Sequence, residues 1–197
     1  MVQATLETLK IVGYADASAR AIARVGGFNQ ALIFYHFGSV EDLLLASLQD
    51  FSERRLERYR DDLSGTRSLS TLVEVLTRLY EEDVKVGHIV AAQEIVAGCS
   101  SSTELGPRVV ELLAPWMTFA SELVQSLIQD TFLEGLVPED EIGHAAVALY
   151  FGLETLAHLD RNRSMVRALL DRSSQLAPLM DTVLHADLQF GDAPEQV

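Results

Sequence analysis

The sequence predicts an all-α protein of about nine helices, with a small N-terminal head on a larger helical body. Apolar residues make up 48% of the chain but aromatic residues only 7%, a balance that favours packed helices over strands. Apolar positions recur three or four residues apart in almost every segment, which is the spacing of one helix face. The length of 197 residues fits a small domain plus a medium one. We expect a head over 1–50, a body over 51–188 and a flexible tail over 189–197.

Start and stop signals mark the helices of the head. Gly13 ends the apolar pattern of a first helix. Ser18, Asn29 and Ser39 are residue types that cap helix starts, and they precede a second helix over 19–25, a third that reaches about Phe37 and a long fourth. Ser39 lies three residues before an acidic side chain, as in a capping box.

Five more helices are expected in the body. They cover about 69–86 and 89–97, a segment that starts within 103–107, and then 139–159 and 164–184. Pro115 and Pro178 fall inside two of these helices. We expect each proline to kink its helix, and Pro178 to kink or interrupt the last one, because the ring removes a backbone hydrogen bond.

Charge divides unevenly along the chain. The net charge is −14, yet residues 1–60 carry seven basic and seven acidic side chains, so all of the acidity belongs to the remainder. A neutral head on an acidic body is compatible with DNA binding by the head alone, although it lacks a basic footprint. Four arginines stand among acidic residues in the fourth helix, and we interpret them as a solvated face with local ion pairs. They are Arg54, Arg55, Arg58 and Arg60.

Composition also argues against several classes of protein. The single cysteine, Cys99, excludes an internal disulfide and a cysteine-based zinc site, and we interpret it as an inert thiol rather than a redox sensor. His144 and His158 are about 21 Å apart along one helix, too far to share a metal. We therefore expect no metal and no cofactor. Without an apolar run long enough to cross a bilayer, the chain is expected to be cytoplasmic and not membrane-bound.

The segment from Ser18 to Phe37 has the layout of a helix-turn-helix. Two helices of about two turns are joined by a glycine turn at 26–27. On the first helix, Ile22 and Val25 lie three residues apart on one face. On the second, Ile33 and Phe37 lie four apart. These two apolar faces are predicted to pack together and onto the first helix of the chain.

The outward face of the third helix suits a DNA groove. If Ile33 points inward, Ala31 and Tyr35 point outward and Leu32 lies on a flank. Such an uncharged face can contact thymine methyl groups in the major groove. At the start of this helix, Asn29 and Gln30 can reach base edges or phosphates, and near its end Tyr35 and His36 can donate to phosphate oxygens.

The run from Gly13 to Leu44 resembles the DNA-binding head of the TetR family. Eleven positions match the family pattern directly: Gly13, Tyr14, Ser18, Ile22, Ala23, Gly27, His36, Phe37, Ser39, Glu41 and Leu43. The resemblance covers about residues 4–50. With it, the candidate DNA contacts are Ser18, Asn29, Gln30, Ala31, Leu32, Tyr35, His36 and Ser39.

Two departures from the family pattern weaken the expected DNA affinity. Phe34 stands where the family usually has a phosphate-contacting tyrosine, and Val40 stands where it usually has a lysine. The basic arm that often precedes the first helix is also missing. Because each lost cationic contact weakens binding and its salt dependence, we expect either modest, salt-tolerant affinity or a start site upstream of Met1.

The resemblance further implies a homodimer and a ligand cavity inside the body. In the family the last two long helices form a four-helix interface. The candidates here are Ala145, Ala148, Leu149, Gly152, Leu156, Leu169 and Met180. Trp116, Met117 and Phe119 follow Pro115 and are placed either to line the cavity or to pack in the core. Tyr80 and Glu94 are weaker candidates, since a carboxylate on an apolar stretch is more often at the surface or paired.

The sequence thus predicts a TetR-type transcriptional regulator. We interpret it as a repressor that a small-molecule effector releases from a double-stranded DNA operator. The alternative is a helical protein-interaction adaptor that has weakened or lost DNA binding, which Phe34 and Val40 favour. An enzyme is disfavoured, and no catalytic residue is expected, because the sequence has no nucleophile with a base at a recognisable spacing and no phosphate-binding loop.

Overall fold

The computed structural model describes residues 1–100 and 102–186, and within them the chain forms nine helices and no strand. The helices are α1 (Val2–Val12), α2 (Ala19–Gly26), α3 (Ala31–Phe37), α4 (Val40–Leu63), α5 (Leu69–Val86), α6 (His88–Cys99), α7 (Leu105–Ile128), α8 (Glu139–Asp160) and α9 (Ser164–Leu184). The predicted all-α class is confirmed. The tail expected over 189–197 lies outside the described residues.

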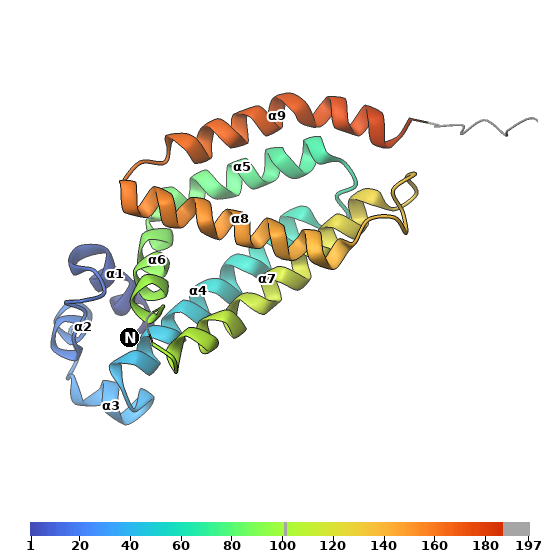
Figure 1. The fold of residues 1–197 in the computed structure, drawn as a ribbon. Coiled ribbons are helices and arrows are strands. Elements are labelled where there is room, and N and C mark those ends of the chain that lie inside the picture. Colours follow the sequence, from blue (N-terminus) through green and yellow to red (C-terminus); the bar gives the residue numbers. More distant parts are fainter. Residues whose placement is uncertain (101, 187–197) are drawn as a thin grey trace, which may run out of the picture.

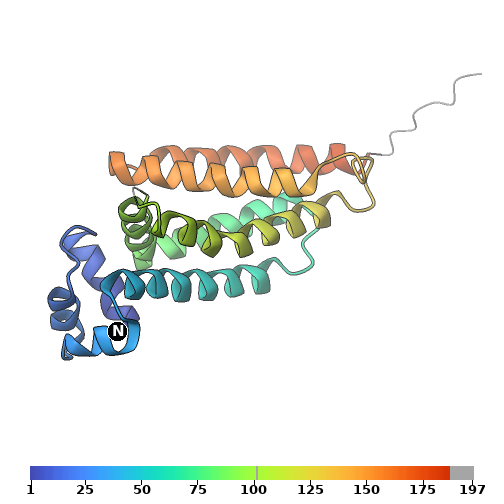
Figure 2. The same cartoon turned by 60° about the horizontal axis from the view of Figure 1, so that its bottom comes forward.

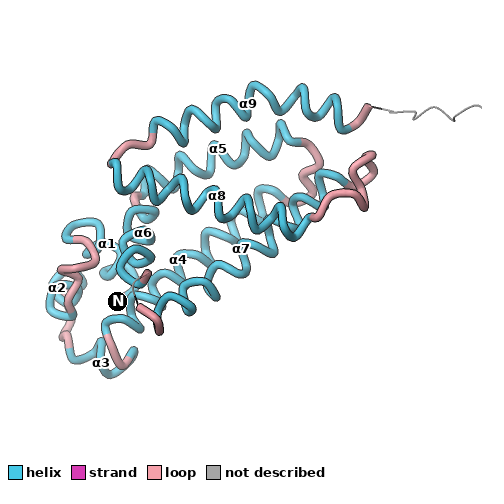
Figure 3. Tube along the Cα trace, in the orientation of Figure 1, coloured by secondary structure: helices cyan, strands magenta, loops and turns pink. Residues whose placement is uncertain are grey.

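The three short helices gather at one end of the molecule, and the six longer ones form the rest (Figure 1). Seen after rotation, α4 forms one side, α8 and α9 form the opposite side, and α5, α6 and α7 lie between them (Figure 2). Mostly short loops join the helices (Figure 3). Packing does not simply follow the sequence, because α9 packs mainly on α5, and α1 packs on α4 and α6 as well as on α2. This arrangement leaves α3 at the tip of the small end, away from α8 and α9.

Side-chain caps fix where the helices begin. Ser18 and Ser39 each accept a hydrogen bond from the backbone N–H three residues ahead, at 3.3 and 2.9 Å. The third helix begins at Ala31 rather than directly after Asn29, because Asn29 Oδ1 accepts from the Ala31 N–H at 2.9 Å across a preceding turn. The Ser39 hydroxyl donates to the Asp42 carboxylate at 2.6 Å. A full capping box also needs a hydrogen bond from the Ser39 N–H to this carboxylate, and that bond is not formed.

Neither internal proline interrupts its helix. Pro115 lies within α7 and Pro178 within α9, and both helices continue past them. The expectation that Pro178 might break the last helix is therefore wrong. The reason is that a proline removes one backbone bond, which tertiary packing on both sides can offset.

A small core holds the head together. Ile22, Ile33 and Leu43 are fully buried and pack with one another, so α2 and α3 are fixed against the start of α4. Val25 does not join this core and is 41% exposed, contrary to the sequence prediction. It lies about 60° around the helix from Ile22, and the ring of Phe28 in the turn packs against the cluster instead.

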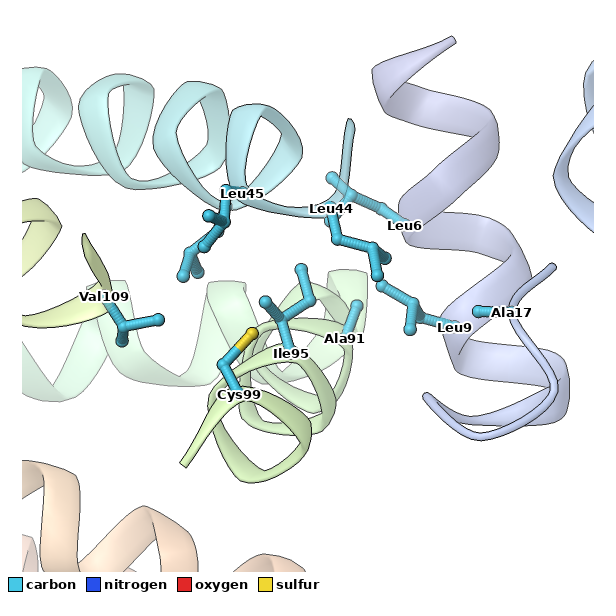
Figure 4. Close-up of a cluster of buried hydrophobic side chains, with 10 residues drawn as sticks. Leu6, Leu9, Ala17, Leu44, Leu45, Ala91, Ile95, Cys99 and Val109 are labelled. Atoms are coloured by element: carbon cyan, nitrogen blue, oxygen red, sulfur yellow. The ribbon is translucent and has the colours of Figure 1, made fainter. Parts of the chain in front are cut away.

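A second core is shared between the head and the body. Leu6 and Leu9 of α1 pack on Leu44 of α4 and on Ile95 and Cys99 of α6, all at most 3% exposed (Figure 4). The helix α4 runs without a break through the residue at which the sequence suggested a boundary between head and body. A displacement of α6 therefore acts directly on α1.

The last helix is tied to the body by a carboxylate at the start of α5. Asp181 accepts from the backbone N–H groups of Leu69 and Ser70, at 2.6 and 3.0 Å, and from the hydroxyls of Ser68 and Ser70. Burial opposes ionisation of this group, but the hydrogen bonds outweigh burial and hold the pKa of Asp181 below its usual value. A negative charge is also favoured at a helix N-terminus.

Replacing Asp181 with alanine should lower the free energy of unfolding by about 1–2 kcal/mol, because two half-buried N–H groups lose their charged acceptor. Urea denaturation at pH 7 measures this loss. Since the folded-state pKa is lowered, the contribution is present above the unfolded pKa of about 4 and fades as the pH falls below it. Asp171→Ala, at an exposed site on the same helix, is the control and should change little. Equal losses in the two variants would refute the role of this cap.

Candidate DNA-binding surface and ligand site

The outer face of α3 is exposed in the orientation that the sequence predicts. Ile33 is completely buried and anchors the helix, whereas Tyr35 is 81% exposed. Ala31, Leu32 and Phe34 are exposed as well, so the face is mainly apolar. The Tyr35 and His36 rings meet edge to face, with their centroids 4.9 Å apart. A short, rigid helix with an uncharged outer face is the shape that enters a major groove.

The other candidate DNA contacts lie around this helix. Asn29 and Gln30 are exposed at its start, and Ser18 is exposed at the start of α2. Ser39 is half-buried, and its hydroxyl is already engaged with Asp42. The fold thus gathers the predicted residues at one end of the molecule, with Ser39 the least accessible of them.

Two arginines on α2 were missed by the sequence reasoning. Arg20 and Arg24 are exposed, four residues apart, and neither forms an ion pair within residues 1–100 and 102–186. Their spacing places both on one side of α2. Guanidinium groups in such a position are suited to phosphate oxygens. The i, i+4 spacing of the two arginines was the signal that could have revealed them.

A partly open hollow of about 50 Å³ lies in the body between α4, α6, α7 and α8. Its lining residues are Leu48, Phe51, Ser52, Arg55, Ile89, Ala92, Gln93, Val96, Leu113, Trp116, Tyr150 and Phe151. Most of the wall is apolar or aromatic. The polar groups are few, which is the usual composition of a small-molecule site.

A buried guanidinium forms the polar part of this wall. Arg55 donates through Nε to Asp83 and through Nη2 to the hydroxyls of Tyr59, at 3.0 Å, and Tyr150, at 2.7 Å. Its guanidinium also lies 4.9–5.2 Å from the ring centroids of Tyr59, Trp116 and Tyr150. Burial lowers the pKa of Arg55, but the tyrosines and Asp83 outweigh burial and raise it above its ordinary value. Arg55 therefore stays cationic inside the protein.

The expectation of a solvated arginine face is wrong for Arg55, which is 11% exposed, whereas Arg58 is 40% exposed but lacks the local ion pair that the sequence suggested. Both donate to the carboxylate of Asp83, a residue of α5 that is 4% exposed. Arg55 continues the inward-facing row of Leu48, Ser52 and Tyr59, whose spacings of three and four residues define one helix face. Asp83 lies on another helix, and the local charge pattern of α4 does not reveal this ion-pair partner.

The five predicted ligand residues do not gather at one site. Trp116 lines the hollow and donates from Nε1 to Ser52 Oγ at 2.7 Å. Phe119 and Tyr80 are buried in two other core clusters, and Met117 is half-buried outside the lining. The sequence did not indicate Arg55, Gln93 and Tyr150 as ligand residues, because only the packing of α4 against α6 and α8 brings their side chains to one hollow.

Glu94 is paired, and it joins the head to the body. Its Oε2 accepts from the backbone N–H of Tyr14 at 2.7 Å, and its Oε1 lies 3.1 Å from His158 Nε2 on α8. Gly13 has a φ of 73°, and a Cβ there would lie 3.0 Å from the Glu94 carboxylate. The glycine that ends α1 therefore allows the chain to turn against this side chain.

Two more polar contacts tie the head to the body. Lys10 donates from Nζ to the carbonyl of Val86 at the end of α5, at 3.0 Å. Arg108 on α7 pairs with Asp42 in the first turn of α4, at 2.9 Å. The head is thus linked to α5, α6 and α7 separately, so its orientation depends on the positions of all three.

The outer surfaces of α8 and α9 are rich in exposed apolar side chains. The seven dimer candidates named from the sequence are all exposed, including Leu149 at 63% and Leu156 at 65%. Further exposed apolar residues on these helices are Ile142, Leu159, Met165, Leu176, Leu179 and Val183. Large apolar patches of this kind mark interaction surfaces.

A second hollow, of about 130 Å³, lies where α1 meets α4 and the junction of α5 and α6, and Asp50, Arg55, Arg58 and Asp83 are among its lining residues. Cys99 is 1% exposed at the end of α6, and burial raises the pKa of its thiol, as an inert cysteine requires. Residues 1–100 and 102–186 contain no group of three or more side chains placed to hold a metal. No single helix in these ranges is long and apolar enough to cross a membrane, and α3 and α4 reach that length only as a pair bent by 67°.

Comparison with known proteins supports the same architecture. A family model described as "Bacterial regulatory proteins, tetR family" matches residues 2–47. The HTH-type transcriptional regulator UidR of Escherichia coli strain K12 is 26% identical over 128 residues, which are 65% of this chain and 62% of UidR. The matched part therefore spans less than two thirds of that relative.

Two solved structures share the fold. The fatty acid degradation regulator FadR of Bacillus halodurans superposes with a TM-score of 0.74 at 18% identity, covering 89% of this chain and 95% of FadR. FadR of Bacillus subtilis, solved in complex with stearoyl-CoA, gives a TM-score of 0.67 at 15% identity with the same coverage. The fold and its exposed third helix define a helix-turn-helix protein. Residues 2–47 match the model of the tetR family of bacterial regulatory proteins, and the fold over 89% of the chain is shared with the two FadR structures.

Replacing Glu94 with alanine should lower the free energy of unfolding by about 1–3 kcal/mol, because the Tyr14 N–H loses its charged acceptor. Urea denaturation monitored by circular dichroism measures the change. Glu122→Ala removes an exposed carboxylate on α7 and serves as the control, with an expected effect below about 0.5 kcal/mol. A stability of the Glu94 variant equal to that of the control would show that this contact does not hold the head.

Proposed function

We propose that the protein is a dimeric, DNA-binding transcriptional repressor whose operator affinity falls when a small molecule binds inside its body. The exposed outer face of α3 carries this proposal. Ile33 is completely buried and anchors the helix, Tyr35 is 81% exposed, and α3 itself lies at the tip of the molecule (Figure 1). The division of labour follows the sequence expectation, with residues 1–50 contacting DNA and 51–188 sensing and dimerising.

In the proposed complex, α3 enters the major groove. Ala31 and Leu32 contact thymine methyl groups, and Asn29 and Gln30 reach base edges or phosphates from the helix start. A second set of contacts fixes the position on the backbone. It comprises Ser18, Ser39, Tyr35, His36, Arg20 and Arg24. The two arginines on α2 supply the cationic contacts that Val40 does not.

Dimerisation through α8 and α9 is supported by the apolar surface that these helices expose. A permanent dimer buries about 1,600 Å² or more. The small residues Ala145, Ala148 and Gly152 allow two helices to approach closely, and Leu149 and Leu156 add apolar area between them. Two copies of α3 would then contact successive major grooves, about 34 Å apart.

The route from ligand to DNA runs through α6. Gln93 lines the hollow, and the next residue, Glu94, holds the backbone of the head at Tyr14. A ligand that displaces α6 at Gln93 therefore moves the anchor of the head. The dimer samples one spacing of its two heads that fits DNA and another that does not. A ligand weakens the free energy of DNA binding by as much as it binds the second spacing more strongly than the first. The relative FadR of Bacillus subtilis, in complex with stearoyl-CoA, is consistent with a ligand-responsive body.

The alternative function is an adaptor that works through protein contacts. The exposed Phe34, at 52%, favours it, because an apolar ring replaces a phosphate-contacting hydroxyl. Titration with random duplex DNA at two salt concentrations distinguishes the two functions. A repressor binds with an affinity that falls as salt rises, whereas an adaptor does not bind.

Tyr35→Ala should weaken DNA binding by about 1–2 kcal/mol, or roughly five- to thirtyfold, because a phosphate contact and apolar area are lost. Fluorescence anisotropy with labelled duplex DNA gives the affinity. The melting temperature should stay within about 2 °C of the wild type, since the side chain is exposed. Tyr35→Phe separates the hydroxyl from the ring. A Tyr35→Ala variant that melts much earlier would show that Tyr35 is a structural residue instead.

Leu149→Glu and Leu156→Glu should each convert the dimer to monomers, because a carboxylate in an apolar interface loses its hydration without a partner. Sedimentation velocity at micromolar protein concentration reports the assembly. Leu136→Glu introduces the same charge at an exposed site between α7 and α8, and this control should remain dimeric. If both interface variants sediment like the control, the dimer interface lies elsewhere.

A further inference from the structure

We propose that the effector is an apolar monocarboxylic acid, whose carboxylate binds beside Arg55 and Tyr150 in the hollow between α4, α6, α7 and α8. This inference rests on the proposed ligand-responsive function and names the chemical class of its ligand. Four features carry it: the local charge balance, the available donors, the apolar wall and the size of the hollow.

The charge balance around Arg55 leaves a positive surplus. The single carboxylate of Asp83 accepts from both Arg55 and Arg58. Within residues 1–100 and 102–186, no second carboxylate pairs with either guanidinium, since the neighbouring Asp50 pairs with Arg54. Arg58 is 40% exposed and reaches solvent, whereas Arg55 is 11% exposed, so solvent screens the charge of Arg55 only weakly. One bound anion would balance this cluster, because buried charges are stable when paired.

The polar part of the wall offers hydrogen-bond donors. Tyr150 accepts from Arg55 through its oxygen, so its own proton is available. Burial raises the pKa of Tyr150, and the hydroxyl stays protonated. Gln93 accepts from Thr155 through Oε1 at 3.3 Å, and its amide nitrogen has no hydrogen-bond partner in the described part of the chain. Arg55 Nη1 likewise makes no hydrogen bond there.

Such a set of donors selects among ligand classes. A carboxylate has only acceptor oxygens and carries the charge that the cluster needs. A neutral amide offers one carbonyl acceptor but brings donors of its own and no charge. An amine would place a second positive charge beside Arg55. The order of affinity expected for one apolar chain is therefore acid first, amide second and amine last.

The remaining wall and the volume describe the rest of the ligand. Leu113, Trp116 and Phe151 provide apolar and aromatic surface. At about 50 Å³ the hollow holds a carboxylate-sized group, whereas a cavity that binds benzene measures about 150 Å³. The apolar chain must therefore displace lining side chains and part α6 from α7 and α8. Because Glu94 follows Gln93 on α6, this opening acts on the contact that holds Tyr14.

The test is calorimetric titration of the full-length protein with octanoate and 3-phenylpropionate. The matched probes are octanamide, 3-phenylpropionamide and octylamine. We expect at least one acid to bind about tenfold or more tightly than its amide, since a hydrogen bond to a charged group exceeds one to a neutral group by that factor. Octylamine should not bind. The same acid should raise the melting temperature of the free protein.

A pair of tyrosine variants locates the site. Tyr150→Phe removes only the hydroxyl and should weaken binding of the acid about tenfold. Tyr80→Phe makes the same change at a buried tyrosine that does not line the hollow, and acid affinity should be unchanged. Gln93→Leu, which removes a second donor at similar volume, should weaken binding of the acid as well. Circular dichroism verifies that each variant is folded.

Several outcomes would overturn the inference. The first is that the amides bind as tightly as their acids. The second is that neither acid gives heat or a thermal shift at millimolar concentration. The third is that the Tyr150→Phe and Gln93→Leu variants bind the acids as tightly as the wild type does. The DNA titration is separate from these measurements. DNA binding without acid binding refutes this inference alone, whereas acid binding without DNA binding refutes the regulatory function.

Discussion

The packing of α1 against α6 is the constraint on which the rest of the molecule depends. Leu9 and Ile95 are almost completely buried in a core that belongs to neither the head nor the body alone. Because the interior is close-packed, α6 cannot shift without moving α1 or opening a void. The contact from Glu94 to the Tyr14 N–H adds a directional tie at the end of the same helix. Head orientation is thus a property of the whole fold.

The second constraint is the charge buried at Arg55. Three aromatic rings and one shared carboxylate hold a guanidinium inside the body, where an unpaired charge would be unstable. Removing Asp83 would leave two arginines without their common partner. The same cluster borders the hollow that we assign to the effector, so the groups that stabilise the body also give the site its polarity.

These two features are connected through one turn of α6. Gln93 lines the hollow and contacts Thr155 of α8, and Glu94, about 100° around the helix, contacts His158 of α8 and the head at Tyr14. A helix is stiff along its axis, and a displacement at one residue is carried to its neighbour. The proposed regulator therefore needs no long pathway between its ligand and its DNA-binding surface. A single displaced helix is sufficient.

By itself, the sequence determined the helices, their caps and the outward face of α3. Helix starts depend on residues three or four apart, such as Ser18 with the N–H of Ala21, and the apolar spacing of α3 turns Ile33 inward, where it packs on Ile22 and Leu43. It also indicated the exposed apolar faces of α8 and α9. Only the tertiary structure decided that Arg55 is buried and that Glu94 holds the head. Both depend on partners 28 and 80 residues away, and local periodicity carries no information about contacts at such separation.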